Sequence, residues 1–222
     1  LSGGGARAVS ALTEVPGASR TLLEAIVPYS QRSLVLWLGG FPDQFCSADT
    51  ARRMAMVGFL RALELEETEA PLAGVSCTAS LATNRPKQGD HRAHVAIQTT
   101  SFTALRSLVL RKGGRTRAEE ERLISRMVLN AAAEACGLEP SLELDLFDDE
   151  QIERSQTIAP PAWQELLLGR SEIVRIGPRD KDDSGEGRIL FSGAFHPIHE
   201  GHRRMAQLAE ERLGKPVEFE IT

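Results

Sequence analysis

The pattern of hydrophobic and polar positions divides the first 140 residues into alternating helices and strands. Apolar residues at three- and four-residue steps predict helices, and alternation of apolar with polar residues predicts strands with one buried face. The expected helices cover residues 6–13, 31–38, a segment that begins after Ser47, and a segment from the Thr116 cap to about Cys136. The expected strands cover residues 22–27, 73–78, 91–98 and 102–111.

Local signals support two of these helices directly. Ser47 is a good N-cap residue, and small and apolar residues recur at helical spacing after it. Thr116 and Glu119 have the spacing of a capping box, and Gly137 is placed to end the same helix. Because helices and strands interleave while residues 91–111 have the pattern of a hairpin, we expect a three-layer α/β/α domain with a mixed sheet.

The pattern weakens after this first domain, which we place at residues 1–140. Residues 141–187 are rich in acidic side chains and contain two consecutive prolines, so we expect a linker there that packs on a neighbour through Trp163. Within it the sequence suggests a short helical stretch at 163–168, a short apolar piece at 173–176 and a polar run at 180–187.

The last part of the chain, residues 188–222, predicts a βαβ unit. Its expected elements are strands at 189–192 and 217–221 around a helix at 201–213. We interpret this unit as the N-terminal fragment of an incomplete Rossmann-like domain, which continues beyond the sequence given.

Composition and cysteine usage narrow the class of protein. Of the 222 residues, 41% are hydrophobic and 26% are charged, a mixture that forms a core and is not typical of a disordered chain. No apolar run approaches the roughly 18 residues needed for a membrane span. The sequence begins at Leu1 and shows no recognisable leader, and a leader that precedes Leu1 is left as an alternative. Three widely spaced cysteines indicate reduced thiols in the cytoplasm.

The net charge of −5 is unevenly distributed. Residues 141–187 hold 12 acidic and 5 basic side chains, a net charge of −7, which leaves 21 basic and 19 acidic side chains elsewhere. The rest of the chain therefore carries +2 and has no long basic stripe. This distribution disfavours a binder of duplex nucleic acid.

The most specific chemical feature is the histidine loop, residues 193–202, which reads Gly-Ala-Phe-His-Pro-Ile-His-Glu-Gly-His. It follows an expected strand and opens an expected helix, where free backbone N–H groups favour anions. His199 and His202 are three residues apart, so both rings can face the same oxygen. The alternatives are a histidine-rich turn or a metal site; two histidines without a third ligand make a weak zinc site, and we predict no metal ligands.

This loop resembles the G-x-F-x-P-x-H-x-G-H signature of the nucleotidyltransferase superfamily. The matching residues are Gly193, Phe195, Pro197, His199, Gly201 and His202. The resemblance implies that the two histidines contact nucleotide phosphates and stabilise the charge that develops as pyrophosphate leaves. It also implies a nucleoside triphosphate and Mg²⁺ as ligands of the complete domain, whose further βα units and second motif lie beyond residue 222.

A second resemblance covers most of residues 1–137. The stretches that carry it are Ser2-Gly3-Gly4-Gly5, Val15-Pro16-Gly17-Ala18-Ser19, Val27-Pro28-Tyr29-Ser30, Val75-Ser76-Cys77-Thr78 with the strand from Arg92, and Gly114-Arg115. They resemble the C-terminal domain of the CinA family, which includes nicotinamide mononucleotide deamidases. At the first three of these stretches the family sequences are S-C-T-G-G, V-P-G-A-S and V-x-Y-S-N-x-x-K. The resemblance implies amide hydrolysis without a cofactor, with Ser2 as nucleophile beside Tyr29 and Thr78.

The chain departs from the CinA pattern where the chemistry would occur. Gly3 and Gly4 replace the family's cysteine and threonine, and Leu34 replaces its lysine, the expected base for the serine. Substitute bases are Tyr29, Arg85, Lys87 and His91. The glycine loop either forms an oxyanion or phosphate cradle or is a tight turn that enters a helix.

The expected ligand contacts of the first domain come from the glycine loop and from two polar loops. They are Gly3, Gly4, Gly5, Ser80, Arg85, Lys87, His91 and Arg115. A loop that carries basic side chains can close over an anion, and an arginine at a helix start can hold a phosphate. The ordinary alternative is that these side chains face water.

Two hypotheses of different class follow. The first is binding, and hydrolysis, of a pyridine mononucleotide by the first domain, fused to a nucleotidyltransferase in NAD metabolism. The second is a catalytically inactive domain that binds a ligand or forms oligomers for the transferase. Under both hypotheses we expect the protein to bind a small-molecule nucleotide and to self-associate. We expect it to bind neither nucleic acid nor a membrane.

Overall fold

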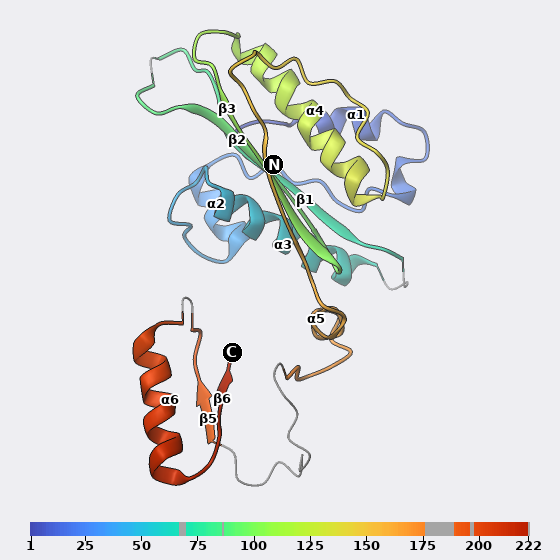
Figure 1. Ribbon diagram of the computed structural model, residues 1–222. Coiled ribbons are helices and arrows are strands. Elements are labelled where there is room, and N and C mark those ends of the chain that lie inside the picture. Colours follow the sequence, from blue (N-terminus) through green and yellow to red (C-terminus); the bar gives the residue numbers. More distant parts are fainter. Residues whose placement is uncertain (67–69, 86, 176–188, 196–197, 222) are drawn as a thin grey trace. The chain divides into compact units, whose positions relative to one another are not determined.

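The protein is described by a computed structural model over residues 1–66, 70–85, 87–175, 189–195 and 198–221. The chain forms two compact units, Leu1–Val174 and Arg175–Thr222, and each is described by itself (Figure 1). In the described part of the chain, no helix combines the length and apolar character that a membrane crossing requires.

The first unit is built on a four-stranded sheet in the order β1-β2-β3-β4. The strands are β1 (Ala73–Ser80), β2 (His91–Thr99), β3 (Phe102–Leu110) and β4 (Glu153–Ile158), and each pairs antiparallel with its neighbour. At the free edge of β1, Ser2 forms an isolated parallel bridge with Thr78. The α/β class is thereby confirmed, and the expected hairpin is the β2–β3 pair.

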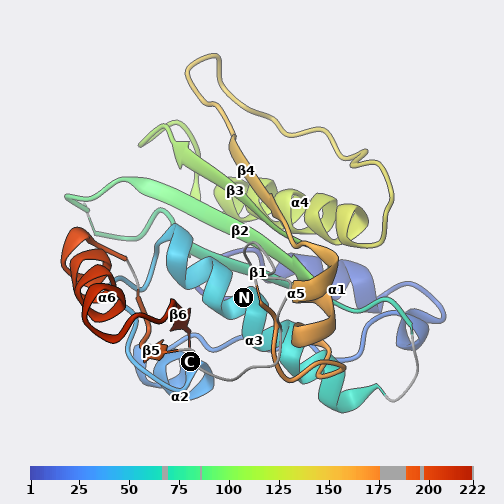
Figure 2. The ribbon, with the colours of Figure 1, turned by 60° about the horizontal axis from the view of Figure 1, so that its bottom comes forward.

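Helices cover both faces of this sheet (Figures 1 and 2). One face carries α1 (Arg7–Thr13) and α4 (Arg117–Ala135), and the other carries α3 (Ala48–Leu65), against which α2 (Gln31–Leu38) packs. A single 3₁₀ turn at Ala18–Arg20 follows α1. The Ser47 cap of α3 and the Thr116–Glu119 capping box of α4 are both formed, so these two sequence predictions are confirmed.

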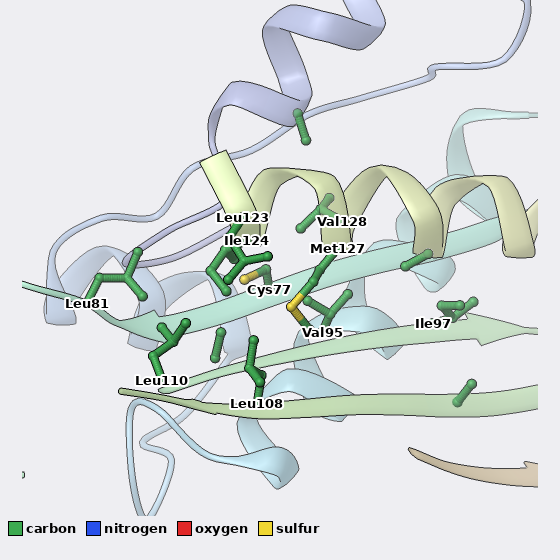
Figure 3. Packing of buried hydrophobic residues seen from close by; sticks show 14 residues of the cluster. Cys77, Leu81, Val95, Ile97, Leu108, Leu110, Leu123, Ile124, Met127 and Val128 are labelled. Atoms are coloured by element: carbon green, nitrogen blue, oxygen red, sulfur yellow. The ribbon is translucent and has the colours of Figure 1, made fainter. Parts of the chain in front are cut away.

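The main hydrophobic core lies between α4 and the sheet (Figure 3). Figure 3 shows Ile124, Met127 and Val128 of α4 pointing toward Cys77 and Val95 of the strands. On the other face, α3 approaches β1 so closely that a Cβ at Gly74 would lie 2.0 Å from the Ala55 carbonyl oxygen. Small residues at this contact therefore set the distance between helix and sheet.

The strand expected at residues 22–27 is not formed, and this prediction is wrong. The segment runs beside the first residues, with the Leu1 amine donating to the Ile26 carbonyl at 2.8 Å. Ser2, however, uses its own N–H and C=O to bond Cys77 and Ala79 of β1. Residues 22–27 therefore find no partner strand with free backbone groups along its length.

The acidic segment after residue 140 belongs to the first unit for much of its length, which differs from the linker expected there. Residues 141–152 return along α4, and β4 then joins the sheet beside β3. All six side chains of β4 are exposed, so this strand carries no apolar alternation that could reveal it. A short helix, α5 (Pro161–Leu167), follows, with Trp163 46% exposed; the polar run at 180–187 lies outside the described residues.

The second unit contains the expected βαβ arrangement. Strands β5 (Ile189–Ser192) and β6 (Val217–Glu220) pair in parallel around α6 (Glu200–Leu213). Phe191, Phe195 and Phe219 pack ring against ring with centroids 5.1–5.4 Å apart. This aromatic cluster supports the loop that leads into α6.

Candidate functional site

Ser2, the expected nucleophile, donates its hydroxyl hydrogen bond to the Pro28 carbonyl oxygen at 3.1 Å. A serine becomes nucleophilic when a neighbouring base accepts its proton. The atom at that position is a backbone carbonyl, and Tyr29, the next residue, is 70% exposed. Leu34, where the CinA family has lysine, is buried in the apolar interior. Among the described residues, no basic side chain forms a hydrogen bond with the Ser2 hydroxyl.

Thr78 lies beside Ser2 but uses its hydroxyl elsewhere. The isolated bridge places the two backbones side by side, whereas the buried Thr78 hydroxyl donates to the Phe45 carbonyl oxygen at 2.7 Å. This bond fixes the segment before α3 against the sheet. The structure therefore brings the backbones of Ser2, Tyr29 and Thr78 near one another in space, but it does not join their side chains into a catalytic set.

His91 is oriented by a carboxylate but lies away from Ser2. Its Nδ1 is 2.7 Å from Oε1 of Glu120, a fully buried residue of α4 whose Oε2 accepts the Ala82 N–H. Thr78, the bridge partner of Ser2, lies opposite His94, three residues from His91. With strands about 4.8 Å apart and a rise of about 3.3 Å per residue, Ser2 and His91 are roughly 14 Å apart.

The glycine loop, residues 2–5, is a tight turn that fits closely against β1. Gly3 has φ +78°, and a Cβ there would lie 1.9 Å from the Ala79 carbonyl oxygen. At Gly4 a Cβ would lie 2.8 Å from Leu81 Cδ1, and Gly5 has φ +84°. Glycine is therefore needed here for backbone conformation and close packing.

The Gly5 N–H at the end of the glycine loop, and the Arg7 N–H just after it, are already bound to an anion of the chain. Glu121 of α4 accepts from the Gly5 N–H at 3.0 Å and from the Arg7 N–H at 3.3 Å. One turn earlier in α4, Arg117 donates to the Gly3 carbonyl oxygen at 2.8 Å. Of the two alternatives left open by the sequence, these contacts favour the turn, with Glu121 in the position of an oxyanion or phosphate.

Arg115 also has its anion within the chain. Its guanidinium donates to both oxygens of Glu150, at 2.6 and 2.7 Å, and stacks 4.0 Å from the centre of the Phe147 ring. The two side chains are 7% and 1% exposed. The backbone N–H groups of Arg111 and Phe147 donate to the same carboxylate at 2.8 and 2.9 Å.

Glu150 is held as a carboxylate by these four N–H bonds. Burial opposes its ionisation, but the hydrogen bonds from Arg115 and from the Arg111 and Phe147 backbones outweigh burial and lower its pKa below the ordinary 4.5. Neighbouring arginines are paired similarly: Arg111 with Asp149, and Arg126 with Asp145 at 2.7 Å. The acidic segment thus supplies the counter-ions of the basic surface around the start of α4.

A cleft of about 280 Å³ opens beside this ion-pair network. Its lining includes Arg115, Arg122 and Arg126, but also Glu119 and Asp145. Because Arg115 is bound to Glu150 and Arg126 to Asp145, the lining carries little uncompensated positive charge. The cleft is therefore a poor site for a phosphate.

The remaining expected ligand contacts are partly brought together. Lys87 Nζ donates to the Ser80 hydroxyl at 3.0 Å and to the Leu81 carbonyl oxygen at 2.8 Å. Arg85 is exposed, and the Thr83 hydroxyl donates to its carbonyl oxygen. Lys87 and Ser80 thus form a polar pair at the end of β1, whereas the Arg85 side chain does not join it.

The histidine loop of the second unit places two imidazoles face to face at the start of α6. The rings of His199 and His202 stack with centroids 3.7 Å apart. His199 Nδ1 accepts the Gly201 N–H at 3.1 Å, and His202 Nδ1 accepts the His199 N–H at 3.2 Å. The preceding loop bends sharply, with Phe195 at φ +43° and Gly193 against its ring; His196 and Pro197 lie outside the described residues.

These contacts determine which ring nitrogens can bind a ligand. A nitrogen that accepts an N–H bond has no proton of its own, so each neutral ring carries its proton on Nε2. Neither Nε2 has a hydrogen-bond partner among the described residues. The pair therefore presents two N–H donors at a helix N-terminus, where the helix dipole also favours an anion.

No protein-family model, no curated protein and no solved structure matches the chain. The resemblances to the CinA and nucleotidyltransferase families consequently rest on the motifs alone. Within the described ranges, no three His, Cys, Asp or Glu side chains are grouped closely enough to hold a metal ion.

Sequence reasoning missed the carboxylates that fill the loops of the first unit. They are Glu120, Glu121 and Glu150. Each lies at least 29 residues from a partner that defines its role, so no local spacing reveals the contact. The available signal, which applies to Glu150, was a charge count: an acid-rich segment follows the helix whose start is basic.

Proposed function

We propose that the second unit binds the phosphates of a nucleotide through His199 and His202, and that the first unit is a companion module that does not hydrolyse amides. The observation that carries the proposal is the pair of stacked rings whose Nδ1 atoms are both occupied by backbone N–H groups. This arrangement leaves two Nε2–H donors directed away from the helix backbone. It suits phosphate oxygens better than a metal ion, which would need unprotonated nitrogens.

Such a pair can act in nucleotidyl transfer without any nucleophile from the protein. When pyrophosphate leaves, negative charge grows on its oxygens, and fixed N–H donors stabilise that charge. The nucleotidyltransferase resemblance implies Mg²⁺ as well, which would neutralise phosphate charge and be held largely by the nucleotide's own oxygens. Gly201 contributes by leaving room for the His199 ring, because a Cβ there would lie 3.0 Å from it.

For the first unit, the contacts of Ser2 favour the inactive module over the hydrolase. Its hydroxyl is bonded to a carbonyl oxygen, and the position of the family lysine is a buried leucine. Hydrolysis of nicotinamide mononucleotide stays a prediction of the CinA resemblance. A cytoplasmic location is part of the proposal, because all three cysteines are free.

Binding of ATP to the full chain, measured by calorimetry with and without Mg²⁺, tests the role of the histidines. We expect His199→Ala and His202→Ala each to weaken binding by about tenfold or more, since each removes a donor to a charged oxygen. Arg204→Gln is the matched control, because Arg204 lies on the same helix and bonds Gln207 rather than the loop. Equal affinity of both histidine variants and the wild type would contradict the proposal.

Ammonia release from nicotinamide mononucleotide tests the first unit. We expect the wild type and Ser2→Ala to release ammonia at the same background rate, because the Ser2 hydroxyl has no base to activate it. Release by the wild type that disappears in Ser2→Ala would restore the hydrolase hypothesis.

A further inference from the structure

The two edges of the sheet in the first unit differ in how their backbone groups are used. At the β1 edge, the Ser2 N–H donates to the Cys77 carbonyl oxygen at 2.8 Å, and the Ser2 carbonyl oxygen accepts the Ala79 N–H at 2.9 Å. The chain itself therefore occupies this edge. Strand β4 forms the other edge and pairs with β3 alone among the described strands (Figure 2).

The hydrogen-bond pattern shows which backbone groups of β4 face away from the sheet. The Ala159 N–H donates to the Ser101 carbonyl oxygen at 2.8 Å, one step beyond the β3–β4 register. Because hydrogen-bonded and non-hydrogen-bonded pairs alternate in an antiparallel ladder, the residues that point their N–H and C=O groups outward are Arg154, Gln156 and Ile158. None of these backbone groups has a hydrogen-bond partner in the described ranges.

Little about β4 blocks the approach of another strand. All six of its side chains are exposed, so no helix in the described part of the chain covers its faces. The β3–β4 register runs from Glu153 to Ile158 without a bulge, and the next proline is Pro160, beyond the strand. Charged side chains, a common protection of edge strands, occur only at Glu153 and Arg154, so the rest of the strand carries none.

We propose that β4 is the contact strand of a symmetric dimer, in which it pairs antiparallel with β4 of a second copy of the chain. The two four-stranded sheets then form one continuous sheet across the interface. Because the contact is between identical edges, and because Ser2 occupies the other edge of each four-stranded sheet, the association ends at two copies and does not continue into a fibre. The proposal does not depend on the role proposed for the histidine loop.

The sequence of β4 selects one register for this pairing. With Gln156 opposite Gln156 of the partner subunit, Arg154 lies opposite Ile158 of the partner subunit, and each outward N–H meets an outward C=O. A shift in one direction brings the Arg154 side chains of the two copies closer together, which their like charge opposes. A shift in the other direction places Pro160, which has no N–H, in the ladder.

The side chains are compatible with this register on both faces of the joined strands. Ile158 is 72% exposed in a single copy, and the aliphatic part of Arg154 of the partner subunit covers it in the dimer. On the other face, Ser155 lies opposite Thr157 of the partner subunit, where the two hydroxyls can form a hydrogen bond. A second copy therefore suits this edge better than a strand of arbitrary sequence. Because the contact is only one strand wide, we expect a transient dimer.

Sedimentation equilibrium of the full chain over a range of concentrations, up to about 0.5 mM, tests the proposal, because a complex with a micromolar Kd is saturated there. We expect the average mass to rise from that of the monomer to that of the dimer and no further. Backbone amide NMR shifts over the same range should change at Arg154, Gln156 and Ile158 and remain constant at residues 199–202. The spectra thus separate this interface from the histidine loop.

Two substitutions at Ile158 form a matched pair, because an exposed side chain contributes little to the stability of the monomer. Ile158→Lys places a cation opposite Arg154 of the partner subunit and should weaken the dimer by about threefold to tenfold, whereas Ile158→Glu places an anion there and should strengthen it by a similar factor. Gln156→Pro removes an outward N–H and leaves the β3 ladder intact, so it should abolish the dimer without unfolding the chain. Circular dichroism and thermal denaturation verify the fold of each variant.

Several results overturn the proposal. A monomer at every concentration would leave the edge to a strand of another protein, and a mass that continues to rise beyond the dimer would contradict closed symmetry. Shifts that exclude β4 would place the interface elsewhere. Equal effects of Ile158→Lys and Ile158→Glu, or a folded Gln156→Pro variant that dimerises as the wild type does, would contradict the pairing of the two strands.

Discussion

The glycine loop of the first unit and the histidine loop of the second both lead into the start of a helix, but their donors are used differently. At the glycine loop, the Gly5 and Arg7 N–H groups bind the Glu121 carboxylate. At the histidine loop, backbone N–H groups occupy the Nδ1 atoms and leave the two Nε2–H groups for a ligand. Similar positions in an α/β unit therefore have opposite consequences for binding.

The difference teaches that a loop able to bind an anion does not necessarily bind one from solution. The arginine-bearing start of α4 makes the same point more strongly, because Glu150 fills its donors as a ligand would, with four N–H bonds to one carboxylate. Whether such a site is open depends on acids elsewhere in the chain. In the first unit those acids come from α4 and from the segment that returns along it.

The largest expected effect comes from removing the internal anion at Arg115. Glu150→Gln leaves a buried guanidinium without its partner, which should lower the free energy of unfolding by about 3–5 kcal/mol. Urea denaturation measures the change. Asp149→Asn is the control, because its partner Arg111 is exposed, and it should have little effect.

Simultaneous replacement of both partners sharpens this prediction. Because Arg115→Met with Glu150→Gln removes the buried charge as well as its counter-ion, we expect the double variant to regain much of the lost stability. A double variant as unstable as the sum of the two single ones would show that the pair does not act as a unit.

The next largest effect concerns the close fit of the glycine loop. Gly3→Ala combines a left-handed backbone with a clash against the Ala79 carbonyl, and should cost at least about 2 kcal/mol. Gly39→Ala is the matched control, since Gly39 has φ +71° and nothing within 4 Å of an added Cβ; it should cost about 1 kcal/mol. Equal losses in thermal denaturation would argue against the close approach.

The pH dependence of stability gives a smaller and more gradual effect. The pKa of Glu150 is lower in the folded protein than its ordinary 4.5, so its contribution is complete above that pH and is lost as the pH falls through the folded value. As the pH is lowered below about 4.5, the denaturation midpoint should therefore decrease more steeply in the wild type than in Glu150→Gln. Parallel curves for the two proteins would contradict the assignment.

Much of the fold follows from local signals. The capped helices α3 and α4 and the β2–β3 hairpin have strong periodicity and turn chemistry within a few residues, and they form as expected. Strand β4 does not, because an edge strand whose six side chains are all exposed, and of which only Ile158 is apolar, has no apolar pattern. The strand expected at 22–27 does not form, for the opposite reason: the segment has the apolar residues of a strand but no continuous partner strand to pair with.

The candidate sites divide in the same way. The approach of His199 and His202 could be predicted, since a three-residue step on a helix places both rings on one side. The carboxylates that accept hydrogen bonds from the Gly5 N–H and from Arg115 could not be predicted, because Glu121 and Glu150 lie 116 and 35 residues away in the sequence. Tertiary contacts of this kind leave no spacing in the sequence.

A titration of the full chain with ATP, followed by backbone amide NMR shifts, tests the contrast between the two loops most directly. We predict saturable shifts at His199 and Gly201, and no shift at Gly5 and Arg7, whose N–H groups are bound to Glu121. Shifts at Gly5 and Arg7 that saturate while residues 199–202 remain unchanged would contradict the account.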